Sequence, residues 1–475
     1  MPHIVKKYKI GYWNVFVLFF CSLFAVFGSL ISINRFWQYE TFHYDFGIFN
    51  QAIWNVSRLR PPIVEHFLVG GKWIFADHFN PSIFIFSPLY LFTERSEVIL
   101  IAQAVFVAIS GFILFLIGKK ITKNPFISFT ILFSYFLFVG LQNGVISDFH
   151  EATVATLPFM LVFLGIVYKI KPLYFLSLLV LLGFKESYYL LGIAIGITLF
   201  FLNKNWKKEA IFTIFISFVW GVVATKIIIP YFSGGTYLYT IPISMNPIDY
   251  VYSLFSNETK INTILKTFKS FGFLPVLSPQ FYLLIIVDFL SRFYPPFLTL
   301  SWTLSLHYSA ITSAIFGISS VFAVSKLQKK VSSKLITITG ILLLINAIYS
   351  NNFFIHAPFG LAINQAFYRH SKNFEFLDIL IKMVPENTTV MTTNNLAPHF
   401  KKQKVMLFRE VKCKDCKEHY QIVMPQYLVV DFREGQNPNN WYGVGDFEKI
   451  RETIENDKKY KAIYKTSDQG VYKRI

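Results

Sequence analysis

The sequence predicts a polytopic membrane protein: an all-α bundle of about 9 to 11 transmembrane helices followed by a small α/β domain. The 475-residue chain is 54% hydrophobic and only 15% charged, and it contains 54 Phe. This composition is too apolar for a soluble globular protein. Several separate apolar runs are about 20 residues long, which is enough to cross a bilayer as a helix. Because the runs are continuously apolar and do not alternate apolar with polar residues, they indicate helices and not the strands of a barrel.

Nine apolar runs are predicted to cross the membrane. The first follows three lysines and lacks a small-residue cleavage site, so we interpret it as a retained helix and not a cleaved signal peptide. The runs 83–92 and 275–293 are short or interrupted by proline and charge, and we expect them to be re-entrant or interfacial. The predicted crossings are 13–33, 98–117, 126–141, 152–167, 173–184, 189–202, 210–229, 302–324 and 335–349.

Basic residues predict the orientation of the bundle. If the crossings alternate, the lysines near the N-terminus share one side with the lysines of four loops, which the positive-inside rule assigns to the cytoplasm. This arrangement predicts an integral, multi-pass protein of the cell membrane with a cytoplasmic N-terminus. It also accounts for much of the net charge of +18 together with anionic lipid, so no nucleic-acid partner is implied. The four loops lie near residues 119–123, 169–171, 204–208 and 326–330.

The composition changes near residue 351 and divides the chain into two predicted domains. Residues 1–350 form a polytopic transmembrane domain whose first external loop, 34–97, is unusually long and polar. Residues 351–475 form an external soluble α/β domain. Its predicted strands are 389–391, 405–408, 427–431, 462–465 and 471–473, and its predicted helices are 374–383 and 446–456.

Cys413 and Cys416 form a lone C-x-x-C pair in this second domain. A closed tetrahedral zinc site needs a second pair of ligands, and a local disulfide in an oxidising exterior is the other interpretation.

The first external loop carries the main candidate for catalysis, Asp45. Apolar residues recur there at helical spacing, which predicts an amphipathic helix lying in the membrane interface. Such a helix can still present a carboxylate to a cavity. Because an ionisable group beside a membrane costs free energy, its presence suggests a function. The candidate substrate-binding residues of the same loop are Tyr44, Gln51, Trp54 and Arg58.

Asp148, His150 and Glu151 form a second candidate site at the predicted external mouth of two crossings. A carboxylate, an imidazole and a second carboxylate within four residues suit a divalent cation such as Mg²⁺ or Mn²⁺, or a diphosphate–metal unit. The alternative is ordinary capping, because an acidic residue at a helix start favours the helix dipole.

Three further pairs carry polar or charged side chains, and two of them, Asp77-His78 and Lys185-Glu186, have a predicted external position. Asp77 and His78 precede a short apolar run, and His307 and Tyr308 interrupt a long one. Lys185 and Glu186 occupy a turn, where the lysine would neutralise a phosphate. The competing interpretations are a solvated turn for Lys185-Glu186 and a hydrogen-bonded core histidine for His307. We assign all six residues to substrate binding.

No P-loop, G-x-S-x-G or other nucleotide-binding or hydrolase motif occurs in a sequence context that would support it. An external active site without ATP must use an activated substrate. A sugar linked to a lipid phosphate and delivered within the membrane is one such substrate.

These residues resemble a family of predicted multi-spanning membrane proteins known as domain of unknown function 2079. The likeness covers most of the chain, and it is carried by the order and spacing of its motifs. They are YDFGIFNQAIW at 44–54, Asp77-His78-Phe79, Pro88-Leu89-Tyr90, Gln103-Ala104, Asp148-Phe149-His150-Glu151, Lys185-Glu186, His307-Tyr308-Ser309-Ala310, Ala397-Pro398-His399 and YLVVD at 427–431.

That family is distantly similar to the GT-C glycosyltransferases, which move a sugar from a polyprenyl-phosphate donor to an acceptor at the outer face of the membrane. The resemblance implies a GT-C-like fold and, by position in the first external loop, Asp45 as the catalytic carboxylate. It does not imply the sugar or the acceptor. The chain departs from a metal-dependent pattern in having no Asp-x-Asp pair beside Asp45.

The leading hypothesis is an inverting, GT-C-like glycosyltransferase whose donor is a polyprenyl-phosphate-linked sugar and whose acceptor is a glycan, a lipid or a protein. Its partners are membrane lipid and, at the metal site, a divalent cation. One alternative is a transporter or flippase for lipid-linked or small anionic solutes, which would use the same charges as a pathway. Another is a non-catalytic receptor that binds through its external domain.

Overall fold

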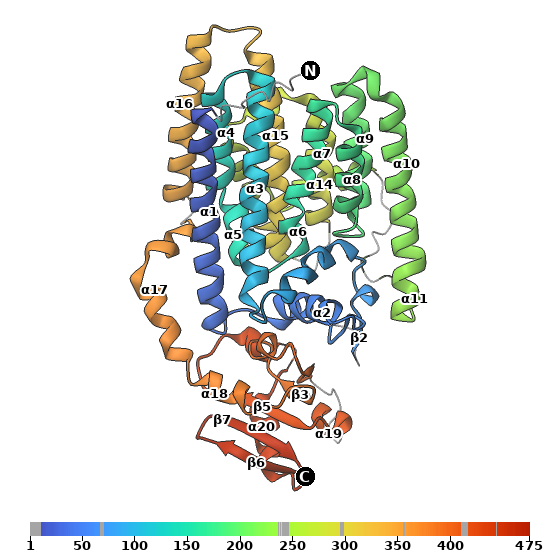
Figure 1. The fold of residues 1–475 in the computed structure, drawn as a ribbon, viewed down its shortest axis with the longest axis vertical. Helices are drawn as coiled ribbons and strands as arrows, with labels where there is room; N and C mark the ends of the chain where they lie inside the picture. Colours follow the sequence, from blue (N-terminus) through green and yellow to red (C-terminus); the bar gives the residue numbers. More distant parts are fainter. Residues whose placement is uncertain are drawn as a thin grey trace, which may run out of the picture.

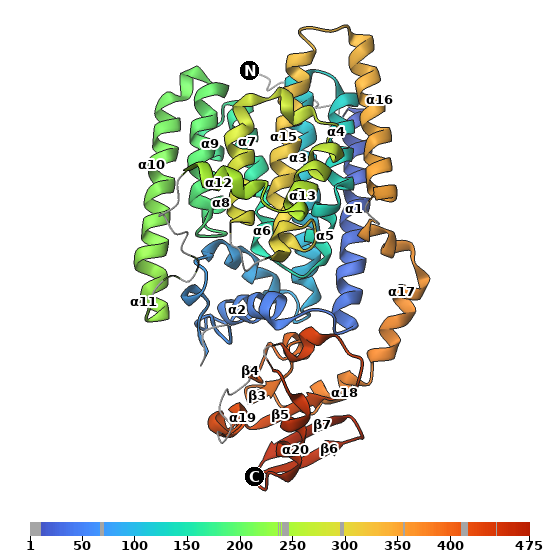
Figure 2. The same ribbon diagram turned by 180° about the vertical axis from the view of Figure 1, so that it is seen from behind.

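The structure, a computed structural model, describes residues 11–66, 71–235, 237, 239, 247–294, 299–354, 357–409, 417–442 and 444–475. It consists of a helical bundle with a small sheet domain attached to one end (Figure 1). Two connections lie at the opposite end of the bundle: the one between α9 (Tyr188–Leu202) and α10 (Lys207–Val223), and the one between α15 (Ala310–Leu327) and α16 (Ser333–Tyr349) (Figures 1 and 2). Helix α2 (Ile48–Ser57) lies between the bundle and the sheet domain. Cys413 and Cys416 lie outside the described residues.

Each of the nine predicted crossings overlaps one or more helices, although the crossing predicted at 302–324 is continuously helical only from His307. Six helical segments among the described residues are long and apolar enough to span a membrane: Tyr12–Trp37 (α1), Glu97–Thr122 (α3), Glu151–Tyr168 (α6 and α7), Lys204–Ser233 (η4, α10, η5 and α11), His307–Leu327 (η9 and α15) and Ser333–Asn352 (α16 and part of η10). Two others, α8 (Lys171–Leu182) and α9 (Tyr188–Leu202), are apolar but shorter. Large apolar side chains on α1, α10 and α16 remain exposed, as lipid-facing surfaces require.

The predicted crossing 126–141 is two helices, α4 (Pro125–Leu137) and α5 (Val139–Ile146), which meet at an angle of 54°. The break at Phe138 frees two backbone carbonyls inside the bundle. The side chain of Gln142 donates to the carbonyl of Phe136 at 2.9 Å, and that of Asn351 donates to the carbonyl of Leu137 at 2.6 Å. Side-chain amides therefore satisfy the groups that a continuous helix would have paired. If this bent pair of helices is counted as one membrane span, the described residues contain up to seven spans.

The first loop contains the predicted amphipathic helix, α2 (Ile48–Ser57), which follows a π-helical turn, η1 (His43–Gly47). A two-stranded hairpin, β1 (Ile63–Val64) and β2 (Lys72–Trp73), and the 3₁₀ turn η2 (Ile74–Ala76) come next. The predicted re-entrant run 83–92 is a 3₁₀ helix, η3 (Pro81–Leu91), with Pro88 inside it. It packs against α2, so the loop is a folded layer beneath the bundle.

The predicted re-entrant run 275–293 begins with two short 3₁₀ turns, η6 (Leu274–Leu277) and η7 (Pro279–Phe281), and ends as α14 (Tyr282–Phe293). This helix has only 12 residues and packs against α9 and α15 within the bundle. The preceding segment contains α12 (Pro247–Leu254) and α13 (Glu258–Ser270).

The C-terminal domain has a five-stranded sheet in the order β4-β3-β5-β7-β6. Strands β3 (Thr389–Thr392), β4 (Lys404–Leu407) and β5 (Tyr427–Asp431) are parallel, and β6 (Tyr460–Lys465) and β7 (Gln469–Arg474) add an antiparallel hairpin. All five strands match predicted ones. The helices are α17 (Gln365–His370), α18 (Leu377–Lys382), α19 (His419–Val423) and α20 (Phe447–Asn456).

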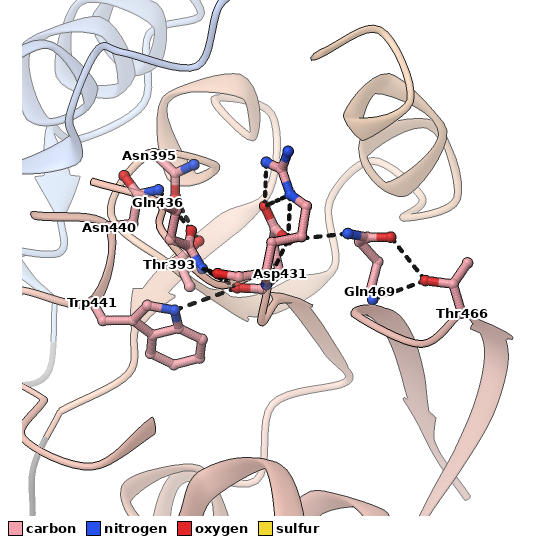
Figure 3. Close-up of polar contacts among 9 residues, drawn as sticks. Thr393, Asn395, Asp431, Gln436, Asn440, Trp441, Thr466 and Gln469 are labelled. Carbon is pink, nitrogen blue, oxygen red and sulfur yellow. Dashed lines mark hydrogen bonds and ion pairs between the residues drawn. The ribbon is translucent and has the colours of Figure 1, made fainter. Parts of the chain in front are cut away.

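A saturated polar network closes the end of β5 (Figure 3). The buried carboxylate of Asp431 accepts hydrogen bonds from Arg433 and Gln469, and its backbone carbonyl accepts from Trp441 and Gln436. Because every oxygen of Asp431 has a donor, we assign this network a structural role.

The C-terminal domain is fastened to the first loop by several side chains. Asn50 donates to the carbonyl of Pro398 at 3.3 Å, Gln51 donates to the carbonyl of Gln403 at 2.7 Å, and Tyr39 donates to Asp378 at 2.6 Å. These bonds join residues more than 300 positions apart, so the domain directly determines the shape of the loop.

Candidate active site

Asp45 lies on the turn η1, which both domains hold in place. The side-chain oxygen of Asn394, just past β3, accepts from the backbone N–H groups of His43 and Tyr44 at 2.9 and 3.3 Å. The side chain of His43 bonds the carbonyl of Glu65 at 2.8 Å. Among the described residues, the Asp45 carboxylate has no hydrogen-bond donor, and it is therefore available to a ligand.

The loop after α5 brings a second carboxylate to this turn. Asp148 accepts from the backbone N–H of Phe42 at 3.0 Å, and its φ of 120° is a strained conformation for a residue with a side chain. The buried amide of Gln103 fixes the loop, because it donates to the carbonyl of Asp148 at 2.6 Å and accepts from the N–H of His150 at 2.8 Å. Strain that the surroundings hold in this way is common at functional sites.

Asp45, His150 and His307 converge from three separate segments. One potential ligand atom from each lies within 4.8 Å of the other two. The two imidazole rings are stacked, with centroids 3.2 Å apart, and Tyr308 lies beside His307 with ring centroids 4.1 Å apart. A carboxylate and two imidazoles are a donor set for a divalent transition metal.

Glu151 and Lys185 form an ion pair next to this triad, with 3.0 Å between Nζ and Oε1. Glu151 is fully buried at the start of α6, and Lys185 lies in the turn between α8 and α9. The second oxygen of Glu151 is 3.0 Å from Nδ1 of His150, but that nitrogen accepts from the N–H of Ala152, so the second oxygen has no hydrogen bond. A buried carboxylate oxygen without a donor favours a cation nearby.

The charges of this group shift the pKa values of its members. Burial and then the charge of Glu151 raise the pKa of Asp45 to about 6, against the effect of Lys185. Burial and the charge of Asp45 hold the pKa of Asp148 well above its usual range. Burial and the positive charge of Lys185 hold the pKa of His150 well below its usual range. His150 is therefore neutral, which is the form of an imidazole that can bind a metal.

A second group of charges surrounds Glu186 on the other side of the turn. His78 bonds Glu186 at 2.9 Å, and the hydroxyl of Tyr237 donates to the same carboxylate at 2.7 Å. Tyr239 donates to Asp77 at 3.0 Å and stacks on the ring of His78. Burial would lower the pKa of His78, but the carboxylates of Glu186 and Asp77 outweigh it and raise the pKa to about 9.

The His78–Glu186 pair should make stability depend on pH. Because the pKa of His78 is raised from 6.5 to about 9, its contribution is complete below pH 6.5 and is lost as the pH rises through 9. The contribution is at most about 3 kcal/mol. We expect the thermal midpoint of the purified protein to fall between pH 7 and 9.5, and the His78→Gln variant to lose most of this dependence. An identical pH profile in the variant would contradict the pairing.

Four predicted substrate-binding residues contact other parts of the molecule. Tyr44 packs on Tyr442, and Gln51 is bonded to the C-terminal domain. The indole of Trp54 lies under the guanidinium of Arg58, which in turn bonds the carbonyl of Tyr90. The other ten predicted site residues lie in the two neighbouring groups around Asp45 and Glu186. They are Asp45, Asp77, His78, Asp148, His150, Glu151, Lys185, Glu186, His307 and Tyr308.

Sequence reasoning missed several residues that complete the site. Gln103 and Asn394 position the two carboxylate loops. Tyr237 donates to Glu186, and Tyr239 donates to Asp77. Gln103 had a usable signal, because a fully buried amide in an apolar run must bond something specific. The tyrosines sit in a long connection without periodicity and offered no such signal.

Comparisons with known proteins place the chain in a family. The model of the family described as "Predicted membrane protein (DUF2079)" matches residues 35–473. No curated protein matches the sequence. The fold is similar to the crystal structure of ArnT from Cupriavidus metallidurans bound to undecaprenyl phosphate, with a TM-score of 0.55, 9% identity, and 97% of this chain and 98% of ArnT covered. The apo structure of the same ArnT gives a TM-score of 0.54 over the same shares, also at 9% identity. The chain therefore belongs to the DUF2079 family of predicted membrane proteins, and its fold is similar to that of ArnT.

Proposed function

We propose that this protein is a GT-C-like glycosyltransferase that moves a sugar from a polyprenyl-phosphate donor to an acceptor at the external face of the membrane. The observation that carries the proposal is the convergence of Asp45 with His150, His307 and the Glu151–Lys185 pair at the end of the bundle nearest the sheet domain. The ArnT structure with the same fold holds undecaprenyl phosphate, a polyprenyl phosphate, which supports this class of donor.

In the proposed reaction, Asp45 accepts the proton of an acceptor hydroxyl. The hydroxyl oxygen forms a bond to the anomeric carbon, and the bond from that carbon to the phosphate oxygen breaks. The lipid phosphate leaves with the electron pair of that bond. Direct attack at the anomeric carbon inverts its configuration. A base held at the acceptor hydroxyl contributes about 10²- to 10⁴-fold to a rate.

Lys185 and His78 are the cations placed to hold the departing phosphate. Burial opposes the charge of Lys185, but Glu151 and Glu186 outweigh it and keep its pKa above the usual range. His78 carries a proton at neutral pH for a similar reason. Arg58, a third cation of the first loop, stacks on Trp54 and bonds the carbonyl of Tyr90. None of its contacts among the described residues is with the charged groups around Asp45 or Glu186, so we assign the phosphate to the other two. Charge-assisted bonds of this kind strengthen as negative charge collects on the leaving oxygen.

The residues of the triad fit a divalent cation. Two imidazoles and a carboxylate favour Mn²⁺ or Zn²⁺ over Mg²⁺, which prefers oxygen ligands. A bound cation would supply a positive charge that stabilises the phosphate. Since a carboxylate has two oxygens, Asp45 can bind a cation with one and accept a proton with the other.

Metal binding should depend on both histidines of the triad. We expect the wild-type protein to retain about one equivalent of Mn²⁺ or Zn²⁺ after desalting, and the His150→Ala and His307→Ala variants to lose it, because two ligands hold a divalent ion poorly. Elemental analysis by mass spectrometry measures this directly. The matched control is His370→Ala, an exposed histidine on α17. Equal metal content in all four proteins would contradict the site.

Lipid that copurifies with the protein tests the donor class. The full-length protein, extracted in mild detergent and analysed by mass spectrometry, should carry polyprenyl phosphate or a polyprenyl-phosphate sugar. A Lys185→Met/His78→Gln variant should carry less of it at equal yield. Another class of lipid or solute, held equally by the variant, would favour transport over transfer.

A further inference from the structure

A cavity of about 500 Å³ lies between the first loop and the C-terminal domain, apart from the Asp45 group. The loop side of its wall comes from α2 and β1, and the domain side comes from β4 and the segment before it. This volume is within the range of small-molecule sites. None of the charged residues that converge on Asp45 lines the cavity.

Four basic side chains line this cavity: Arg60, Lys401, Lys402 and Lys404. Its one acidic lining residue, Glu65, is neutralised by Arg409, whose Nη2 lies 2.6 Å from the carboxylate. The lining is therefore strongly positive, since the single carboxylate already has its own partner.

Three of these cations have no carboxylate within ion-pair distance among the described residues. Lys402 is paired with Glu94 at 2.8 Å and with Glu386 at 2.6 Å. Arg60 makes only a 3.4 Å bond to the amide oxygen of Asn387, and Lys404 is exposed on β4. Positive charges gathered around a cavity without carboxylate partners favour an anionic ligand.

Lys401 is the most constrained of the three. Its Nζ donates to the hydroxyl of Ser96 at 2.9 Å and to the backbone carbonyl of Glu94, and it lies over the rings of Trp54 and Tyr90. Burial lowers the pKa of Lys401 to about 8, with Lys402 acting in the same direction. Lys401 is half-buried and bonded only to neutral groups, and such a cation gains stability when an anion binds beside it.

We propose that this cavity is a second binding site, which takes a ligand that carries a phosphate group. Arg60, Lys401 and Lys404 would contact the phosphate, because clustered lysine and arginine side chains are the usual ligands of a dianion. The amides of Gln51, Asn55 and Asn387 share the wall and would bond hydroxyl groups. The phosphate comes either from a soluble phosphorylated sugar or from a lipid headgroup. The site does not depend on the proposed transfer reaction.

Binding of glucose 6-phosphate to the full-length protein in phosphatidylcholine nanodiscs tests the proposal by calorimetry. We expect glucose 6-phosphate to bind at least tenfold more tightly than glucose, and the Arg60→Gln/Lys404→Gln variant to lose at least tenfold in affinity, because each charge-assisted bond is worth more than a neutral one. The matched control is Lys458→Gln/Lys461→Gln, which removes two exposed lysines beside and on β6, at the opposite edge of the sheet from β4. Asp45→Asn should bind like the wild type, even if the transfer reaction is disproved.

The same titration in nanodiscs that contain phosphatidylglycerol separates the two sources of phosphate. If the ligand is a headgroup, this lipid should prevent glucose 6-phosphate from binding to the wild type. If it is soluble, affinity should be unchanged. Equal affinity for glucose, equal affinity in the double variant, or no phosphate binding in either membrane would overturn the proposal. The single charge reversal Lys404→Glu repeats the test if the double variant has a lower thermal midpoint.

Discussion

Replacement of Asp45 by asparagine should lower the rate of sugar transfer by about 10²- to 10⁴-fold, because an amide cannot accept the proton of the acceptor hydroxyl. The side chains have nearly the same shape, and the Asp45 carboxylate has no hydrogen-bond donor among the described residues, so folding should be unaffected. The measurement is the release of polyprenyl phosphate from a labelled polyprenyl-phosphate hexose, with cell-envelope extract as acceptor.

The matched control for this change is Asp249→Asn on α12, where the carboxylate is exposed. It should keep the wild-type rate. Yield, thermal midpoint and copurified lipid should be equal for all three proteins. If purified Asp45→Asn releases polyprenyl phosphate at the wild-type rate, Asp45 is not the base, although the donor site itself would remain.

Replacement of Glu151 by glutamine should destabilise the protein by about 3 to 5 kcal/mol, the usual cost of leaving a buried charge without its partner. Glu151 is fully buried, and its carboxylate is the ion-pair partner of Lys185 at 3.0 Å. Lys185→Met should also destabilise the protein, because it leaves Glu151 uncompensated. Denaturant unfolding in mixed micelles measures both changes.

The double variant Glu151→Gln/Lys185→Met separates this pairing from simple loss of packing. Its destabilisation should be smaller than the sum of the two single effects by about 0.5 to 3 kcal/mol, as for residues in direct contact. Additive effects would mean that the two charges do not interact. Lys72→Met, which removes a bond to the carbonyl of Ser233 without breaking an ion pair, is the matched control and should cost less.

The sequence was sufficient for the long apolar helices and for the strands because their signals are local. Continuous apolar runs located α1 and α3, and short β-type runs located all five strands of the C-terminal sheet. The break within 126–141 was not predicted, because its one local signal, Gly140 two residues after Phe138, is weak: a single glycine is tolerated inside a helix. It is maintained by Gln142 and by Asn351, which is more than 200 residues away, and therefore by tertiary structure.

The candidate site was predictable in its members but not in its arrangement. Asp45, His150 and His307 were each identified because an ionisable side chain beside a membrane costs free energy and is therefore a candidate for function. The expected metal group was Asp148, His150 and Glu151, which are close in sequence. The structure instead offers His150 together with Asp45 and His307, because Asp148 is turned toward the backbone of Phe42.

A structure of the protein in a lipid nanodisc with a non-hydrolysable polyprenyl-phosphonate sugar, determined by electron cryomicroscopy, is the most direct test of the proposed active site. The account predicts that the anomeric carbon lies beside the carboxylate of Asp45 and that the phosphonate contacts Lys185 or His78. A phosphonate bound elsewhere, with Asp45 out of reach of the sugar, would contradict it.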